Sequence, residues 1–188
     1  MYTRIFSALD LPLRGKILGI SGLKYFRGSP HYTPPQEIIS KDAEITEINY
    51  PAVDMRRIPF PADLFDVIIA DQVIEHIEGN VEEAIREAHR VLKPGGIAII
   101  TSVFMYPAHW GPKDMWRFSP DGLRYLCRNF SEIIQCEGWG NRYYHALGMF
   151  HKKIRDWKVP DRKLSVVRLL ANKNEQDWPA AVWVVGRK

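Results

Sequence analysis

A strand–helix–strand pattern between residues 65 and 101 constrains the fold of this chain more than any other feature. Residues 65–70 and 97–101 are short apolar runs rich in β-branched side chains, which is typical of strands buried on both faces. Between them, apolar side chains recur every three or four positions over residues 80–92, which predicts a helix with one buried face. Two parallel strands joined by a crossover helix build a sheet that helices cover. The sequence therefore predicts an α/β fold.

Both ends of this helix carry recognisable signals. Asn80 is a suitable N-cap, and Glu83, three residues later, can reach back to complete a capping box. The segment KPGG at residues 93–96 stops the helix, because proline cannot continue it and glycine accepts a left-handed turn. The chain is then expected to enter the second buried strand directly.

Further elements are predicted on both sides of this unit. The expected strands are residues 16–20, 44–50, 131–136 and 180–186, and the expected helices are residues 36–41, a helix opened by Ser119-Pro120, and residues 145–157. No separate strand is recognisable between residues 50 and 65, so one edge of the sheet is expected to be truncated.

The composition is that of an ordinary soluble protein. A chain of 188 residues, 46% hydrophobic and 26% charged, suits a single domain over residues 1–188. No apolar run is long enough to span a bilayer, and the N-terminal segment lacks the apolar stretch of a signal peptide. Cys127 and Cys136 form no CxxC pair, which argues against a zinc site or a disulfide framework. We therefore expect a cytoplasmic protein without a membrane segment or a bound metal.

The charge balance leaves the class of partner open. A formal net charge of +4 is compatible with an anionic substrate or a nucleic acid, although such an excess is more often a solvated surface. Residues 143–173 are basic and aromatic, and this composition fits a substrate lid, a dimer contact or an RNA-facing patch. Nucleic-acid binding is thus an open alternative that the sequence does not favour, and a homodimer is equally compatible.

Four short motifs occur together over about forty residues: IPF at 58–60, FDVI at 65–68, EH at 75–76 and RVLKPGG at 90–96. In this combination the sequence resembles the class I S-adenosylmethionine-dependent methyltransferases, in particular their type 11 group. The resemblance continues less densely to about Asn141. It implies a Rossmann-like sandwich with a mostly parallel central sheet, an antiparallel last strand and helices on both faces.

The resemblance also implies where S-adenosylmethionine would bind. In the family, the loop after the first strand carries an acidic residue and alternating glycines; here Gly19, Ile20, Ser21 and Gly22 take these places and the later glycines are absent. The chain thus resembles a divergent subset with a degenerate glycine loop. At the end of the second strand, Asn49 stands where the family has an acid that binds the ribose hydroxyls.

Two further segments are implied in cofactor binding. Asp54 stands where the family has an acid that accepts from the adenine amino group, and the backbone of Met55 lies beside the adenine. Asp71 or Gln72, after the fourth family strand, would meet the ammonium group of the methionine part. Without the resemblance, Asp54 is simply a carboxylate in a surface loop.

The loop over residues 104–118 follows a central strand and mixes aromatic with ionisable side chains. It resembles a loop in a subset of type 11 enzymes that act on sugars and natural products, which places the methyl acceptor here. The alternative is an aromatic loop packed over the sheet, held by an internal Asp114–Arg117 salt bridge. The candidates for catalysis are His109, then Asp114 as its orienter or as an alternative base, and His76 as a third choice. Those for substrate binding are Tyr106, Trp110, Trp116 and Arg117.

Three functions remain in competition. The first is a methyltransferase for a small-molecule acceptor, such as a sugar or natural-product hydroxyl. The second is a non-catalytic binding or scaffold module that kept the fold, which the degenerate loop and Asn49 favour. The third is an RNA or protein methyltransferase that uses residues 143–173. A dinucleotide-dependent oxidoreductase is disfavoured, because no GxGxxG follows the first strand.

Overall fold

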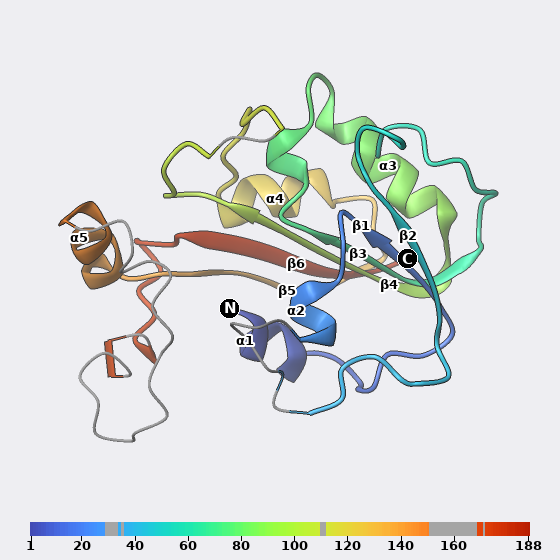
Figure 1. Ribbon diagram of the computed structural model, residues 1–188, viewed down its shortest axis with the longest axis horizontal. Coiled ribbons are helices and arrows are strands. Elements are labelled where there is room, and N and C mark those ends of the chain that lie inside the picture. The colour runs from blue at the N-terminus through green and yellow to red at the C-terminus, as the bar shows by residue number, and fades with distance from the viewer. Residues whose placement is uncertain (29–33, 35, 110–111, 151–168, 171) are drawn as a thin grey trace.

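A sheet of six strands lies at the centre of the part of the chain that the computed structural model describes, which is residues 1–28, 34, 36–109, 112–150, 169–170 and 172–188 (Figure 1). The strands lie in the order β2-β1-β3-β4-β6-β5. Strand β6 runs antiparallel to both of its neighbours, so the other five strands share one direction. The bounds are β1 Lys16–Ile20, β2 Glu44–Ile48, β3 Phe65–Asp71, β4 Leu92–Val103, β5 Glu132–Trp139 and β6 Ala181–Arg187.

Helices cover both faces of this sheet. Figure 1 shows α3 and α4 on one face and the shorter α1 and α2 on the other. The short 3-10 helix η1 follows β3, and α5 follows β5. The bounds are α1 Tyr2–Ser7, α2 Lys24–Arg27, η1 Ile74–His76, α3 Val81–Val91, α4 Pro120–Leu126 and α5 Arg142–Phe150.

The central strands are buried on both faces, which explains their continuous apolar sequences. Successive side chains of a strand point to opposite faces, so neighbouring residues enter different cores. Leu18 and Ile68 pack with the residues of α3 and α4, whereas Ile17 and Ile69 pack with Phe26 on the side of α1 and α2. All five side chains are essentially inaccessible to solvent. Both layers therefore hold β1 and β3 in place, and these strands carry the site described below.

Most of the predicted elements are confirmed, including the strand–helix–strand unit, the antiparallel last strand and the α/β class. Strand β1 has the predicted bounds, and β2 ends two residues before the predicted limit. Among the described residues no strand lies between β2 and β3, as expected for a truncated edge. Helix α5 begins three residues before its predicted start and ends at 150, and residues 151–157 lie outside the described part of the chain.

The helix predicted over residues 36–41 is wrong. Ile39 pairs with Leu13 in an isolated parallel bridge, and the Leu13 backbone amide donates to the carbonyl of Ile38 at 2.8 Å. Ile38 is buried in the core below α1 and α2. Packing against the N-terminal segment therefore outweighs the weak local preference for a helix.

No helix of the described residues has the length and apolar character needed to cross a membrane.

The N-cap of α3 gives a test of local stability. The Asn80 side chain accepts a hydrogen bond from the backbone amide of Glu82 at 2.9 Å. The Glu83 carboxylate accepts from the Asn80 side-chain amide at 3.4 Å, and not from its backbone amide as a capping box requires. We expect Asn80→Ala to lower the free energy of unfolding by about 1 kcal/mol in urea denaturation, because an amide of the first turn loses its acceptor. Asn80→Asp keeps the acceptor and should retain wild-type stability; an equal loss in both variants would contradict the capping role.

Candidate functional site

A cleft lies beside β1, at the point where the order in which successive strands are added to the sheet reverses. Strand β1 has β2 on one side and β3 on the other, so the loops after β1 and β3 diverge from one edge of the sheet. Two cavities open at this edge, one of about 950 Å³ and one of about 560 Å³. Ser21, Gln72 and His76 line both of them. The two cavities thus form one continuous cleft over the carboxyl ends of β1 and β3.

The backbone at the junction of the two cavities is unusual. Ser21 and Gln72 have positive φ angles of 62° and 58°, and Gly22 follows with φ of 97°. Such conformations are uncommon for residues other than glycine and are concentrated at functional sites. Ser21 and Gln72 are each held by a neighbouring strand. The Ser21 amide donates to the Ile48 carbonyl at 2.9 Å, and the Gln72 amide donates to Thr101 Oγ1 at 3.0 Å.

The smaller cavity is lined by the ends of β1 and β2 and by the loop that follows β2. Asn49, Asp54 and Met55 all belong to this wall, as does Ile20. The Asp54 carboxylate accepts hydrogen bonds from the Arg56 guanidinium, the shortest at 2.6 Å, and these bonds hold the pKa of Asp54 below its ordinary value. The Asp54 side chain is still 39% exposed, so it keeps accepting capacity toward the cavity.

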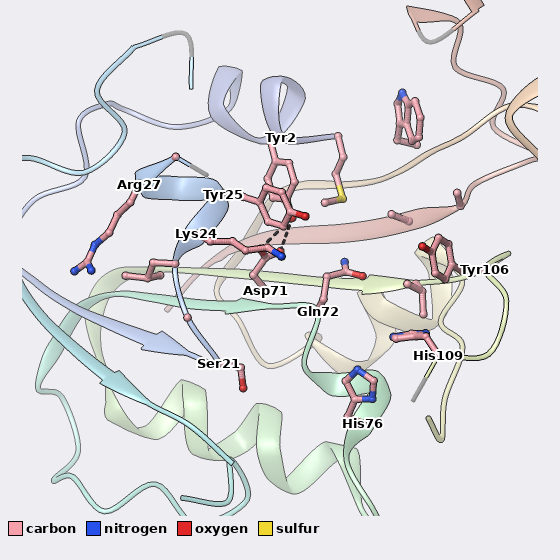
Figure 2. A pocket seen from close by; sticks show the side chains of 18 of the residues that line it. Tyr2, Ser21, Lys24, Tyr25, Arg27, Asp71, Gln72, His76, Tyr106 and His109 are labelled. Atoms are coloured by element: carbon pink, nitrogen blue, oxygen red, sulfur yellow. Dashed lines mark hydrogen bonds between the residues drawn. The ribbon is translucent and has the colours of Figure 1, made fainter. Parts of the chain in front are cut away.

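The larger cavity is lined by Asp71 from the end of β3. Its carboxylate accepts from the Tyr2 hydroxyl at 3.0 Å and from Thr101 Oγ1 at 2.6 Å, and burial raises its pKa. Figure 2 shows Tyr2, Lys24 and Tyr25 above this carboxylate, with the Tyr2 and Tyr25 rings stacked at 4.6 Å. This wall therefore combines an acid with aromatic rings and an amine.

On the opposite wall of the larger cavity lie His76, Tyr106 and His109 (Figure 2). The rings of His76 and His109 meet edge to face at 4.8 Å. The His109 Nδ1 atom lies 3.4 Å from Asp114 Oδ2, close but without hydrogen-bond geometry. The His109 backbone amide donates to the same oxygen at 2.9 Å. Two histidines thus face the cavity, and one has a carboxylate behind its ring.

Asp114 itself is buried and paired with Arg117. Its side chain is 2% exposed, and the two terminal nitrogens of the guanidinium each contact one carboxylate oxygen. The hydrogen bonds from Arg117 hold the pKa of Asp114 far below its ordinary range. The internal salt bridge of the alternative interpretation of this loop is therefore present, and it fixes the carboxylate behind His109.

Comparison with known proteins relates part of this chain to methyltransferases. A family model described as a methyltransferase domain matches residues 33–100. The chain is 31% identical over 101 residues to a chloroplastic 2-methyl-6-phytyl-1,4-hydroquinone methyltransferase 1 from Oryza sativa subsp. japonica, an alignment that covers 52% of this chain and 29% of the relative. The chain spans about a third of the length of the curated relatives that it matches.

Solved structures match the whole chain. Phosphoethanolamine N-methyltransferase 2 from Haemonchus contortus, in complex with phosphomonomethylethanolamine and S-adenosylhomocysteine, has a TM-score of 0.60 at 14% identity, covering 100% of this chain and 52% of that one. The chain has the fold of the class I methyltransferases. This methyltransferase fold is also found in the [4+2]-cyclase SpnF, which matches at a TM-score of 0.54 and 21% identity over 99% of this chain and 78% of that one.

Within this methyltransferase fold, most residues implied in cofactor binding line the cleft, and Gly19 does not. Gly19 is buried in β1, where an added Cβ would lie 2.7 Å from Leu23 Cγ. Its small size thus lets Leu23 pack onto the strand. A Cβ on Gly22 would meet nothing within 4 Å, so the backbone conformation is what requires glycine there.

The residues implied in acceptor binding divide in the same way. Tyr106 lines the larger cavity, whereas the described linings include neither Trp116 nor Arg117. The Trp116 indole donates to the Ile77 carbonyl at 2.8 Å, and Arg117 is held by Asp114. Trp110 lies outside the described residues. Trp116 and Arg117 thus fix the loop over residues 104–118 and do not line the cavities.

Sequence reasoning missed several residues of the cleft. Tyr2 is 69 positions from the carboxylate that it contacts, and no local pattern indicates such a pairing. Lys24 and Glu47, which also line the larger cavity, read as surface residues of a helix and a strand. Glu75 precedes His76 in a recognised motif, and its position after a buried strand was the only available signal of its place beside His109.

The Asp114–Arg117 pair gives a prediction with a defined pH dependence. We expect Arg117→Ala to lower the free energy of unfolding at pH 7 by about 3 kcal/mol, because it leaves a buried carboxylate unpaired. The pKa of Asp114 is depressed in the folded protein, so the stabilisation is present above its unfolded pKa and is lost as the pH falls through the folded pKa. The loss of stability in the variant should therefore become smaller in acid, as measured by urea denaturation across pH.

The control is Arg86→Ala, at an exposed position of α3. A loss of stability in Arg117→Ala that does not vary with pH would contradict the pairing.

Proposed function

We propose that the protein binds S-adenosylmethionine in the cleft and transfers its methyl group to a hydroxyl of a small-molecule acceptor, such as a sugar or a natural product. The observation that carries the proposal is the junction of two cavities at Ser21, Gln72 and His76, over the strand ends where open α/β sheets bind nucleotide-like ligands. One cavity would hold the nucleoside, and the other would bring the acceptor to the transferred methyl group.

The residues present fit the cofactor. Asp54 and the backbone of Met55 suit the adenine, and Asn49 suits the ribose hydroxyls because an amide both donates and accepts. The methionine part would lie at the junction, beside the open side of Gly22 and next to Asp71 and Gln72. Asn49 lacks the charge that strengthens such hydrogen bonds, so the ribose contact is expected to be weaker than one to a carboxylate.

Bound there, S-adenosylmethionine supplies an activated sulfonium methyl group, and the protein has to align the acceptor with it. A hydroxyl acceptor must also lose its proton. His109 is the first candidate to take it, at Nε2, since Asp114 lies behind Nδ1 and orients the ring. His76 lies on the same wall and is the next candidate. Tyr106 would contact the acceptor itself.

The alternatives remain distinguishable. A non-catalytic module with this fold is supported by Asn49 and by the packing role of Gly19. An RNA or protein methyltransferase would depend on the basic residues 143–173, of which 151–168 and 171 lie outside the described part. Binding to a generic RNA that falls steeply with salt would favour that reading.

Calorimetric titration with S-adenosylmethionine and S-adenosylhomocysteine tests the cofactor site first. We expect micromolar binding by the wild type. Asn49→Asp should bind about fivefold to tenfold more tightly, because a charged acceptor strengthens the ribose contact, and Asn49→Leu should bind more weakly. The absence of binding at millimolar ligand by folded protein would contradict the proposal and favour the scaffold module.

Methyl transfer to a panel of sugars and hydroxylated metabolites tests the role of His109. We expect His109→Ala to lower kcat by about 100-fold or more, because no base is left to take the proton of the substrate hydroxyl. The Kd for S-adenosylhomocysteine should stay unchanged. His89→Ala, on α3 and outside both cavities, should keep wild-type activity. Full methyl transfer by the His109 variant would rule out this role.

A further inference from the structure

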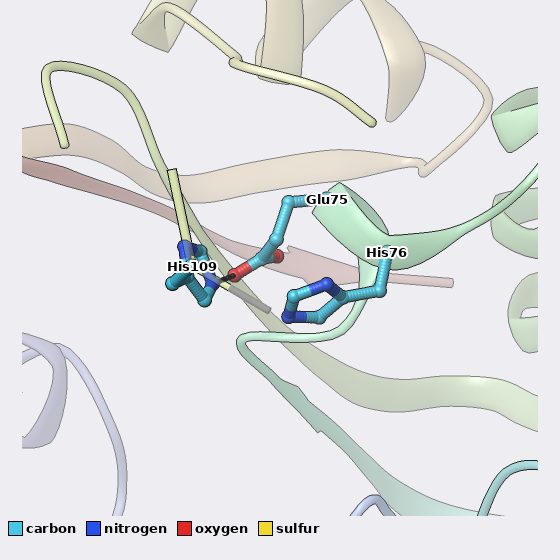
Figure 3. Close-up of side chains that lie close together, drawn as sticks. All are labelled: Glu75, His76 and His109. Carbon is cyan, nitrogen blue, oxygen red and sulfur yellow. Dashed lines mark ion pairs between the residues drawn. The ribbon is translucent and has the colours of Figure 1, made fainter. Parts of the chain in front are cut away.

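Three side chains with metal-binding chemistry converge on one wall of the larger cavity. One donor atom from each of Glu75, His76 and His109 lies within 4.8 Å of the other two, and Figure 3 shows the three groups facing one another. They come from the short helix η1 and from the loop after β4. His109 is 34 positions after Glu75 in the sequence, so the cluster is formed by the fold and not by a local sequence pattern.

The Glu75 carboxylate is the unusual member of this cluster. Its side chain is fully buried, and one oxygen, Oε2, accepts from the Ser102 hydroxyl at 2.9 Å. The other oxygen, Oε1, has no hydrogen-bond partner among the described residues and lies 4.0 Å from His109 Nε2. A buried acceptor without a partner is energetically costly, and native structures retain one chiefly where a water, an ion or a catalytic role accounts for it.

Each of the two histidines has one ring nitrogen available to bind a metal ion. His76 Nδ1 contacts the Lys113 carbonyl at 2.9 Å, and since a carbonyl only accepts, Nδ1 carries the proton and Nε2 keeps its lone pair. His109 Nδ1 lies against Asp114, which leaves Nε2 on the side of Glu75. A ring whose second nitrogen faces a carbonyl or a carboxylate is the usual setting of a metal-bound histidine.

We propose that Glu75, His76 and His109 bind a divalent transition-metal ion at the wall of the larger cavity. Two imidazole nitrogens and one carboxylate oxygen suit Zn²⁺, Co²⁺, Mn²⁺ or Fe²⁺ and leave coordination positions for a ligand. Ligands of a tetrahedral zinc lie about 3.4 Å apart, so binding draws the three groups inward by about 1 Å. We expected no metal because the two cysteines form no CxxC pair. That argument applies only to sites with thiolate ligands, and this site has none.

The proposed ion gives the site a way to activate a hydroxyl, and this role rests on the proposed methyl transfer. His76 and His109 both line the cavity assigned to the acceptor. An acceptor hydroxyl that coordinates the ion has a lowered pKa and loses its proton to solvent in the open cleft. Its oxygen then forms the new bond to the methyl carbon as the carbon–sulfur bond breaks, giving a methyl ether and S-adenosylhomocysteine. In this form His109 is a metal ligand and does not accept the proton, because the cation lowers the pKa of the acceptor hydroxyl enough for the proton to pass to solvent.

Titration of the chelator-treated, dialysed protein with Co²⁺ alone tests the site, followed by visible absorption and by competition with Zn²⁺. We expect one equivalent of Co²⁺ to bind the wild type at micromolar concentration. Glu75→Gln and His109→Ala should each weaken binding by about 100-fold or more. His89→Ala is the matched control for adventitious histidine binding and should behave as the wild type, and circular dichroism checks the folding of every variant.

Unchanged Co²⁺ binding in the folded His109→Ala variant, or no binding by the wild type at millimolar Co²⁺, would overturn the metal site. His109 lies in a loop and is partly exposed, so its variant answers the question even if Glu75→Gln fails to fold. Titration with S-adenosylhomocysteine in the presence of chelator separates the two proposals. Cofactor binding without Co²⁺ binding removes the metal site alone, and Co²⁺ binding without cofactor binding supports the metal site while removing the proposed methyl transfer.

Discussion

The cleft depends on the hydrogen bonds of one side chain, the hydroxyl group of Thr101. It donates to Asp71 at 2.6 Å and accepts from the backbone amide and the side-chain amide of Gln72, at 3.0 and 2.9 Å. Thr101 is fully buried in β4 and lies opposite Asp71 in the register of the parallel pair. One side chain therefore connects two sheet strands to the residue whose positive φ turns the chain into the cleft. A shift of the register by one residue would point Thr101 to the other face of the sheet and leave these groups without partners.

A second set of contacts fixes the wall of the larger cavity that carries His109. The carbonyl of Glu75 accepts from the backbone amides of Met115 and Trp116 at 2.8 and 3.1 Å, which attaches the loop after β4 to the short helix after β3. The buried Asp114–Arg117 pair then holds the interior of this loop. The wall that carries His109 is thus attached to β3 and β4 through hydrogen-bonded main chain, and these bonds limit how far its side chains can move relative to the smaller cavity.

The predictability of this structure follows the range of the interactions. The buried strands and α3 were predictable because their apolar patterns and caps are local. The residues of the cleft were predicted only through the family resemblance, which places them in the loops after the strands. The error at residues 36–41 and the omission of Tyr2 have another origin. Both depend on contacts with the first 13 residues, and no pattern near Ile39 or Asp71 reveals those partners. Gly19 stands where the family has an acidic residue, and only the packing of Leu23 showed why glycine is needed there.

The position of β6 between β4 and β5 has a consequence for the order in which the protein can fold. The strand comes last in the described chain, yet it supplies the partner for one edge of β4 and the pairing of β5. During synthesis, the main-chain N–H and C=O groups along one edge of β4 therefore stay unpaired while the following 77 residues, 104–180, are made. Non-local strand pairing of this kind slows folding and exposes an edge to association with other chains. The same arrangement makes closure of the sheet the step that joins the β5 region, with Trp139 and α5, to the half of the molecule that carries β1 and β3.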